Sequence, residues 1–361
     1  MGKSLKLFLS IFMVAIIVLA GCSSDEAGTE TPSDSTSGDT PAASSGSLLD
    51  TIKEQGKLVA GVNDTLPGFG YVGTDGKNTG FDIDFAKAFA AGILGDAEAI
   101  EFRPLSAQER FTAVQTGEVD VLVRNTTFTT NRDTEVGLNF APPTFYDGQG
   151  IMVPVDSGID SIADLEGARI GVETGTTTEL NLADQMRAAG VNYEAVVFDN
   201  ADAVVAAYES GSIDAWTTDK SGLVSRQSIM ADPAAHKILE ENLSKEPLGP
   251  AVKGGDDKLY DAVKWMTYAT IQAEEWGITS QNVDEFLDSD NPEIKRLLGT
   301  EGNLGEQLGL PADFGYQIIK QVGNYGEIYD RNLGEGSVFK LDRGLNALYT
   351  DGGILYSMPF R

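Results

Sequence analysis

The stretch EVDVLVRNTTFTTNRD, from Glu118 to Asp133, carries the pattern that decides the fold class. Its run from Val119 to Val123 is mostly β-branched and too short for a helix, so it predicts a buried strand. Asn125, Thr126 and Thr127 follow, at the point where a strand of an open α/β sheet ends. Because such carboxyl ends are where these sheets hold ligands, the stretch predicts an α/β fold with a ligand-binding turn.

Arg132 lies shortly after this turn. A guanidinium keeps its charge and offers a fork of donors that matches a carboxylate, while hydroxyls and turn amides can complete the contacts. Arg132 is therefore a candidate to bind a carboxylate. The alternative is a surface arginine in a threonine-rich loop, where such residues are common.

The length and charge of the chain limit its domain number and its partners. A chain of 361 residues is long enough for two domains, and 41% hydrophobic residues can build their cores. The balance of 26 Lys and Arg against 55 Asp and Glu gives a net charge of -29. Bulk repulsion then disfavours nucleic acid and anionic membrane surfaces as partners.

The N-terminus has the layout of a secretory signal, with Lys3 and Lys6 before an apolar run from Leu7 to Ala20. The sequence Leu-Ala-Gly before Cys22 resembles the lipobox of bacterial lipoproteins. Cys22 is the only cysteine, so lipidation explains it better than a disulfide or catalysis. The alternative is an ordinary signal segment that ends in cysteine. We expect residues 1–21 to be removed, and the exported protein to be lipid-anchored at Cys22, facing the periplasm or the cell exterior.

Residues 22–46 form the predicted connection between this anchor and the folded body. From Ser23 to Gly46 the chain is mainly small and polar and contains no large apolar residue. Such a composition cannot repay the entropy of ordering, so it predicts a flexible tether.

The body opens with βα units. Lys57 to Asn63 reads as a strand, and Gly80 to Ala90 reads as a helix whose apolar side chains, Ile83, Phe85, Ala86 and Phe89, point largely inward. Ser106 and Glu109 are spaced as a capping box for a further helix that ends at Gly117. The strand and binding turn of the opening stretch come next.

A second half repeats this order of elements. A predicted strand from Ala168 to Thr174 leads into a helix, with Thr176 and Glu179 spaced as a capping box. A later helix stops at Gly211 and gives a predicted strand from Ile213 to Trp216, followed by a polar turn with Asp219. Two similar lobes explain this repetition.

If both lobes point their strand ends at one cleft, Arg132 faces Asp219 across it, and the pair matches the two charges of an α-amino acid. Alternatively, Asp219 is a solvated loop carboxylate beside Lys220. Thr176 and Thr177 can be simple helix caps, although capping does not exclude contact with a ligand.

The order of several motifs resembles the substrate-binding proteins of polar amino acid ABC transporters. These motifs are GFDIDFAKAF, FTAVQTGEVDVLVRNTTFTTNRD, GVETGTTTEL, GSIDAWTTD and NYGEIYDRNLG. The tail motifs NPEIKRLLG and KLDRGLNALYTDGGILY resemble the longer subgroup that binds general L-amino acids. The resemblance covers roughly Leu48 to the end. It implies a two-lobed type II periplasmic-binding-protein fold, in which each lobe is a mostly parallel sheet flanked by helices and two hinge crossings join the lobes.

The resemblance also implies roles for particular residues. It makes Arg132 the clamp for the α-carboxylate, Thr127 and Thr177 its hydrogen-bonding partners, and Asp219 the acceptor for the α-ammonium. Thr176 is a further candidate ligand-binding residue. Asn63, Asn125 and Glu173 fall at positions that face the ligand side chain. Where smaller relatives place aromatic rings around the ligand, this sequence has Leu66 and Ala107. We therefore expect a broad pocket, in which Phe69 or Phe128 could take over the stacking role.

The fold implied by the resemblance predicts the domain boundaries. Residues 47–145 and 247–361 form lobe 1, which is discontinuous and carries a C-terminal extension, and residues 146–246 form lobe 2. The stretches TFYDGQG near Phe145 and LSKEPLG near Ser244 have the polar, Gly- and Pro-bearing character of the two hinges. The segment from Trp276 to Gly323 is expected to be an insertion of unassigned role.

The expected function is capture of an L-amino acid by a monomeric protein that delivers it to a permease and its ATPase. An enzyme on the same fold, such as a dehydratase, would need a general acid or base in the cleft. The single histidine, His236, is expected at the surface, and Glu173 has no catalytic partner. An amino acid sensor without a permease is the other alternative. The sequence predicts no metal site and no cofactor, because its acidic runs lack the spacing of a Ca²⁺ loop.

Overall fold

The computed structural model describes residues 46–361. The predicted signal segment, Cys22 and nearly all of the predicted tether lie outside these residues. Within the described range, none of the helices is both long enough and apolar enough to span a bilayer.

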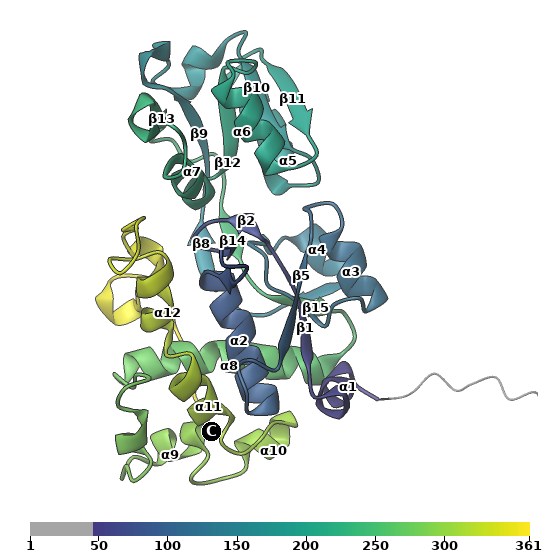
Figure 1. The fold of residues 1–361 in the computed structure, drawn as a ribbon, viewed down its shortest axis with the longest axis vertical. Coiled ribbons are helices and arrows are strands. Elements are labelled where there is room, and N and C mark those ends of the chain that lie inside the picture. Colours follow the sequence, from purple (N-terminus) through teal and green to yellow (C-terminus); the bar gives the residue numbers. More distant parts are fainter. Residues whose placement is uncertain (1–45) are drawn as a thin grey trace, which may run out of the picture. The chain divides into compact units, whose positions relative to one another are not determined.

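The first of two five-stranded sheets forms the centre of the lower half of Figure 1. Its strands run in the order β5 (Ile100–Pro104), β1 (Leu58–Val62), β6 (Val121–Leu122), β15 (Ala251–Lys253) and β7 (Leu138–Phe140). β1 pairs in parallel with β5 and β6, whereas β15 pairs antiparallel with β6 and β7. β15 comes from the C-terminal half of the sequence, so this sheet is built from two separate parts of the chain.

The second sheet repeats this arrangement with residues from the middle of the chain. Its strands run in the order β11 (Glu194–Phe198), β10 (Arg169–Glu173), β12 (Ala215–Asp219), β9 (Gln149–Pro154) and β13 (His236–Ile238). β10 pairs in parallel with β11 and β12, whereas β9 pairs antiparallel with β12 and β13. Both sheets are therefore mixed rather than mostly parallel, and the predicted two-lobed α/β fold is confirmed.

Helices cover both sheets (Figure 1). Those of the second sheet are α5 (Thr177–Ala189), α6 (Ala201–Glu209) and α7 (Lys220–Gln227). Those before the second sheet in the chain are α1 (Leu48–Gln55), α2 (Phe81–Leu94), α3 (Arg110–Thr116) and α4 (Thr130–Thr134). The C-terminal part adds α8 (Asp257–Glu275), α9 (Pro292–Leu298), α10 (Leu304–Leu308), α11 (Phe314–Gln321) and α12 (Tyr325–Asn332). A small sheet of β2 (Thr65–Leu66), β3 (Gly70–Val72) and β4 (Asn78–Thr79) lies beside α2.

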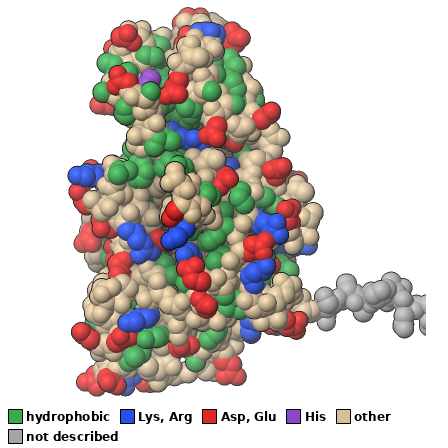
Figure 2. Space-filling model, viewed as in Figure 1, with side chains coloured by type: hydrophobic (Ala, Val, Ile, Leu, Met, Phe, Trp, Pro, Cys, Tyr) green, Lys and Arg blue, Asp and Glu red, His purple; other side chains and the backbone are tan. Residues whose placement is uncertain are grey.

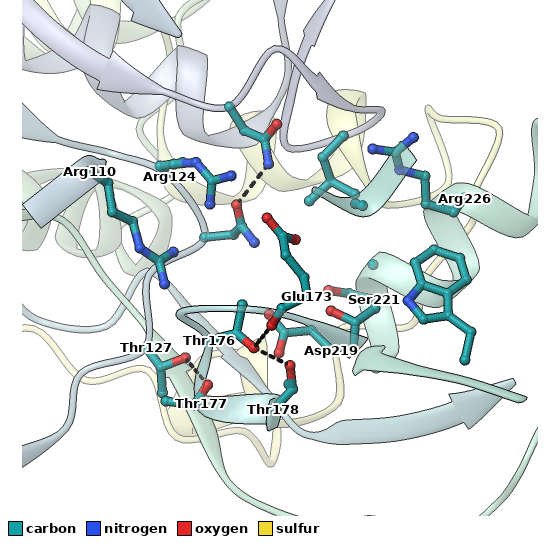
Figure 3. Close-up of a pocket in the computed structure, with 17 residues that line it drawn as sticks. Arg110, Arg124, Thr127, Glu173, Thr176, Thr177, Thr178, Asp219, Ser221 and Arg226 are labelled. Atoms are coloured by element: carbon teal, nitrogen blue, oxygen red, sulfur yellow. Dashed lines mark hydrogen bonds between the residues drawn. The ribbon is translucent and has the colours of Figure 1, made fainter. Parts of the chain in front are cut away.

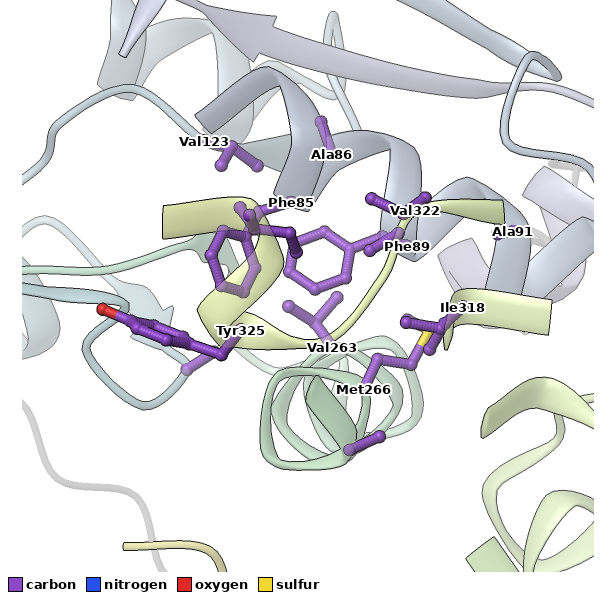
Figure 4. Packing of buried hydrophobic residues seen from close by; sticks show 14 of the residues in the cluster. Phe85, Ala86, Phe89, Ala91, Val123, Val263, Met266, Ile318, Val322 and Tyr325 are labelled. Carbon is purple, nitrogen blue, oxygen red and sulfur yellow. The ribbon is translucent and has the colours of Figure 1, made fainter. Parts of the chain in front are cut away.

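The main core lies where α2 packs against α8 and α11 (Figure 4). As the sequence pattern predicts, Phe85 and Phe89 of α2 are fully buried, and they meet side chains of α8 and α11. Gly92 permits this close approach, because a Cβ atom there would lie 2.4 Å from the sulfur of Met266. The segment from Trp276 to Gly323 supplies α11 to this packing, so it has a structural role in burying the apolar face of α2.

Two short strands carry the chain from one sheet to the other and back. β8 (Phe145–Asp147) and β14 (Glu246–Leu248) pair antiparallel between the sheets. The C-terminal region holds β8 in place, since the Tyr325 hydroxyl donates to the Thr144 carbonyl at 2.7 Å and the Asn346 side chain bonds both backbone groups of Tyr146.

Acidic side chains are spread over the face drawn in Figure 2, with basic side chains among them. The large negative charge is therefore distributed on this face rather than gathered in one patch. The charge at the binding site depends on the side chains inside it, not on the charge of this face.

Candidate functional site

A pocket lies at the ends of strands from both sheets (Figure 3). The residues before the second sheet contribute one wall, and α5, α6, α7, β10 and β12 contribute the other. The space at its centre is about 50 Å³, enough for a few water molecules. The side chains that line it are those of Asn63, Leu66, Arg110, Arg124, Asn125, Thr127, Glu173, Thr176, Thr177, Thr178, Ala201, Trp216, Thr218, Asp219, Ser221 and Arg226, together with Gly222.

The structure brings together all of the sequence-predicted ligand residues except Arg132. Asn63 donates to the Asn125 side chain at 3.2 Å, and the hydroxyls of Thr127 and Thr177 lie 3.3 Å apart although they come from opposite walls. Thr176, Glu173 and Asp219 also line the pocket. Their roles toward a ligand remain predictions.

Arg132 is not among the residues that line the pocket, and it lies in the short helix α4. It is 6% exposed, and its Nη1 donates to the Thr127 carbonyl at 2.8 Å. Its guanidinium carbon lies 4.9 Å from the centre of the Phe111 ring, in cation–π geometry. Burial lowers the pKa of Arg132 to about 10, so it stays charged at neutral pH. Arg132 is thus a buried arginine tied to the binding turn, rather than a surface arginine.

The binding turn has an unusual backbone conformation at Asn125, whose φ of 29° is positive. The Asp82 carboxylate holds this turn by accepting from the Asn125 backbone N–H at 2.7 Å. Burial raises the pKa of Asp82 to about 7, against the opposing effects of this hydrogen bond and of Arg124. The GFDIDF motif therefore acts on the pocket indirectly, through the first turn of α2.

Helix α5 begins in the pocket. Its N-cap, Thr176, accepts from the Glu179 N–H at 3.2 Å, as the predicted capping box requires. The return bond from Glu179 goes to the Gly175 N–H at 3.1 Å instead of the Thr176 N–H. Because a helix N-terminus carries partial positive charge and unpaired amides, this wall suits a carboxylate.

Asp219 is the last residue of β12, not part of a turn after it. The predicted strand was placed about two residues too early, because the run ending at Trp216 looks complete before the polar residues that continue the strand. Asp219 is 8% exposed. Burial raises its pKa well above the usual range, and the nearby carboxylates of Asp147 and Glu246 raise it further, against the effects of Arg110 and Arg132. A positive ligand group here would favour the ionised form.

Three arginines of the pocket were missed by the sequence analysis: Arg110, Arg124 and Arg226. Figure 3 shows Arg110 and Arg124 pointing into the pocket toward Glu173. Arg226 is held by Asp202 at 2.5 Å and by the Thr65 hydroxyl at 3.0 Å, and Arg124 donates from Nε to the Leu105 carbonyl at 2.6 Å. Arg124 lies within the stretch from Glu118 to Asp133, directly after the buried strand. A charged residue at that point could have indicated a position in the binding site.

Arg110 is the least satisfied of these arginines. It is 3% exposed, its Nη1 lies 3.4 Å from the Thr126 hydroxyl, and its Nε has no hydrogen-bond partner among residues 46–361. Burial lowers its pKa well below the usual range, and the charges of Arg132 and Arg124 lower it further. A buried guanidinium with so few partners is suited to receive an anionic group from a ligand.

The expected aromatic substitutes do not take part. Phe69 packs against Phe81 and Phe145 in the main core, and Phe128 stacks on Phe140 at 4.7 Å between ring centres. Neither ring lines the pocket, so neither is placed there to stack on a ligand. Trp216 of β12, directly before Thr217, is the aromatic residue that lines the pocket.

His236 lies in the edge strand β13, where it is partly exposed, with its Nδ1 3.0 Å from the Tyr208 hydroxyl, in line with the expected position at the surface. In the part of the chain that the structure describes, no group of three or more His, Cys, Asp or Glu residues is arranged to hold a metal ion.

Comparison with known proteins points to one family. The family model described as bacterial extracellular solute-binding proteins, family 3, matches residues 58–282. The general L-amino acid-binding periplasmic protein AapJ of Rhizobium johnstonii is 51% identical over 88% of this chain and 94% of its own length. The glutamate/glutamine/aspartate/asparagine-binding protein BztA of Rhodobacter capsulatus is 46% identical over 88% of this chain and 95% of its own.

A solved structure agrees with these sequence relatives. The periplasmic binding protein of an ABC transporter from Brucella ovis, with glutathione bound, superposes with a TM-score of 0.85 at 49% identity. The match covers 88% of this chain and 100% of that one.

Proposed function

This chain belongs to the family 3 bacterial extracellular solute-binding proteins, and we propose that it captures polar L-amino acids outside the cytoplasm for an ABC importer. It acts as a solute-binding component rather than an enzyme, and it hands its ligand to a permease driven by an ATPase. The similarity to AapJ and BztA over most of both chains supports this role.

The observation that carries the proposal is the placement of opposite charges around one small pocket. The start of α5 and Asp219 line this pocket, and Arg132 is bonded to the Thr127 turn that also lines it. Arg132 and the α5 amides are the proposed positive charges for an α-carboxylate, and Asp219 is the proposed acceptor for an α-ammonium. Every α-amino acid has both groups, whatever its side chain. Asn63, Asn125 and Glu173, together with Arg110 and Arg124, are left to meet the side chain.

The proposal is tested by calorimetry with each of the twenty amino acids. We expect more than one tight ligand among the polar and charged L-amino acids, because the side-chain wall offers amide, carboxylate and guanidinium groups. A single strong binder would reject breadth while leaving the transport role intact. If none of the L-amino acids bound, the proposed function would fail.

The same calorimetry should detect proton release at Asp219. The ligand ammonium favours the ionised carboxylate, whereas burial in the free protein favours the protonated form. Binding should therefore release protons, and affinity should fall as the pH is lowered below the raised pKa of Asp219 in the free protein. Titrations at one pH in buffers of different ionisation enthalpy report the proton number directly. Identical enthalpies in all buffers would show that Asp219 does not exchange a proton with the ligand.

We also propose the lobe boundaries given by the resemblance, with lobe 1 from residues 47–145 and 247–361 and lobe 2 from residues 146–246. The crossing strands β8 and β14 support them, since they pair between the two sheets at Phe145–Asp147 and Glu246–Leu248.

The proposed anchor is a lipid on Cys22, which lies outside the described residues. The charged start, the apolar run and the Leu-Ala-Gly before Cys22 support it. Mass spectrometry of the membrane fraction should find a processed N-terminus at Cys22 that carries a diacylglyceryl group. A soluble mature protein that begins at another residue would be incompatible with this anchor.

A further inference from the structure

Glu246 is a buried carboxylate that lies just outside the pocket, on the crossing strand β14. It is 1% exposed and accepts four hydrogen bonds from side chains. Its Oε2 accepts from the hydroxyls of Thr127 at 2.6 Å and Thr177 at 2.8 Å. Its Oε1 accepts from Asn181 Nδ2 at 2.8 Å and from the Ser244 hydroxyl at 2.5 Å.

These partners come from both walls of the pocket. Thr127 follows β6 of the first sheet, whereas Thr177 and Asn181 lie in the first turns of α5 beside the second sheet. The carboxylate of Glu246 therefore links the two walls directly, at the point where the chain crosses between them. The two threonine hydroxyl oxygens share this acceptor and lie 3.3 Å apart.

The hydrogen bonds to Glu246 also fix what the two threonines can offer a ligand. A hydroxyl has one proton to donate and two lone pairs that accept. Both Thr127 and Thr177 direct their proton to Glu246, away from the pocket that their oxygens line. What remains for a ligand is a pair of acceptors, which suits an ammonium group and opposes a carboxylate.

We propose that Glu246 is a positioning residue that presets Thr127 and Thr177 as acceptors for the ligand's α-ammonium group. The two hydroxyls then act with Asp219, instead of donating to the α-carboxylate as the family resemblance implies. The carboxylate is left to Arg132 and to the amides at the start of α5. This inference rests on the proposed binding of amino acids.

The surroundings of Glu246 are consistent with a cation-binding end of the pocket. Asp147, its pairing partner across β8 and β14, accepts from the Ser221 N–H at 3.2 Å, and Ser221 lines the pocket. Burial raises the pKa of Asp147 to about 6, and the charge of Glu246 adds to this effect. Asp147, Asp219 and Glu246 are close enough for their charges to influence one another, and a bound ammonium would relieve that repulsion.

The test compares Glu246→Ala, Glu246→Gln and the control Ser244→Ala, with L-glutamate as the probe. Glu246→Ala frees both threonine protons, and we expect L-glutamate affinity to fall roughly 10- to 100-fold, the loss that one or two hydrogen bonds to a charged group predict. Glu246→Gln should recover most of the affinity, because its amide oxygen can still accept from both threonines. Ser244→Ala touches only the other oxygen and should leave the affinity unchanged.

A second measurement separates positioning from a loss of folding. Affinity for glutarate, which lacks the ammonium group, is measured by displacement of L-glutamate. Glu246→Ala should lower the preference for L-glutamate over glutarate by the same 10- to 100-fold, whereas general damage to the pocket would weaken both ligands alike.

If glutarate binds too weakly to measure, a double-mutant cycle distinguishes positioning by Glu246 from general damage to the pocket. Thr177→Val should cost much less in the Glu246→Ala background than in the wild type, since the hydroxyl is no longer preset. Additive effects of the two substitutions, or full affinity in Glu246→Ala, would overturn the proposal. Failure of the wild type to bind L-glutamate or any other amino acid would instead refute the proposed function.

Discussion

Replacing Arg132 by alanine should abolish amino acid binding for every ligand while the fold remains intact. Arg132 is the proposed fixed positive charge that meets the α-carboxylate, a group that all the ligands share. Losing one partner of a buried charge pair typically costs about 2 to 5 kcal/mol, which is roughly 30- to several-thousand-fold in affinity. Arg132→Lys should restore only part of this, because an ammonium cannot present the two-pronged fork of a guanidinium.

Thermal unfolding with and without ligand measures this effect. The wild type at about 100 times its dissociation constant should gain about 2.7 kcal/mol of apparent stability, visible as a higher melting temperature. Arg132→Ala should lack that rise. The matched control is Arg103→Ala, an exposed arginine of β5 that pairs with Glu101 at 2.7 Å, and it should keep the full rise. A full ligand-induced rise in Arg132→Ala would mean that Arg132 only supports the Thr127 turn.

Replacing Arg110 by methionine should have the second largest effect, restricted to ligands with an anionic side chain. Arg110 lines the pocket with its Nε unpartnered among the described residues. We expect affinity for L-glutamate to fall roughly 30-fold or more, as for the loss of a buried charge partner, and affinity for L-glutamine to change much less. The unliganded protein should not be destabilised, because the substitution removes a buried charge that few groups compensate.

Calorimetry with both ligands and melting of the free protein test these expectations together. Arg187→Met is the matched control, since Arg187 is an exposed arginine of α5 whose side chain is 77% accessible. It should leave the affinities for both ligands unchanged. Equal losses for L-glutamate and L-glutamine in Arg110→Met would show that Arg110 shapes the pocket without recognising a side-chain charge.

The sequence predicts helices and strands well where the periodicity of the hydrophobic residues agrees with the positions of the glycines that end helices. The predicted strand from Lys57 to Asn63 is β1, and the helix predicted at Gly80 to Ala90 is α2 with its apolar positions buried. Gly117, Gly190 and Gly211 have positive φ at the ends of helices or directly after them. The strand ending at Asp219 was misplaced because threonines and an aspartate carry no apolar signal, although hydrogen bonds to β9 extend β12 through them.

The sequence predicted part of the site. The residues that it did not predict share one physical reason. Arg110 stands directly before Phe111 at the start of α3, where an arginine is usually solvated, and it is buried here by tertiary packing. Glu246 is another such case, because its bonds to Thr127, Thr177 and Asn181 span 119, 69 and 65 residues of sequence. Contacts between distant segments leave no trace in local periodicity or spacing.

We expect an amino acid to close the two lobes around itself when it binds, and small-angle X-ray scattering tests this closure most directly. The proposed contacts come from both walls, and the connections between them are the short strands β8 and β14. The purified protein should show a smaller radius of gyration with saturating L-glutamate than without it. The Arg132→Ala variant should show no such change at the same concentration. Identical curves for the wild type at saturating ligand, with binding confirmed by calorimetry, would contradict capture by closure.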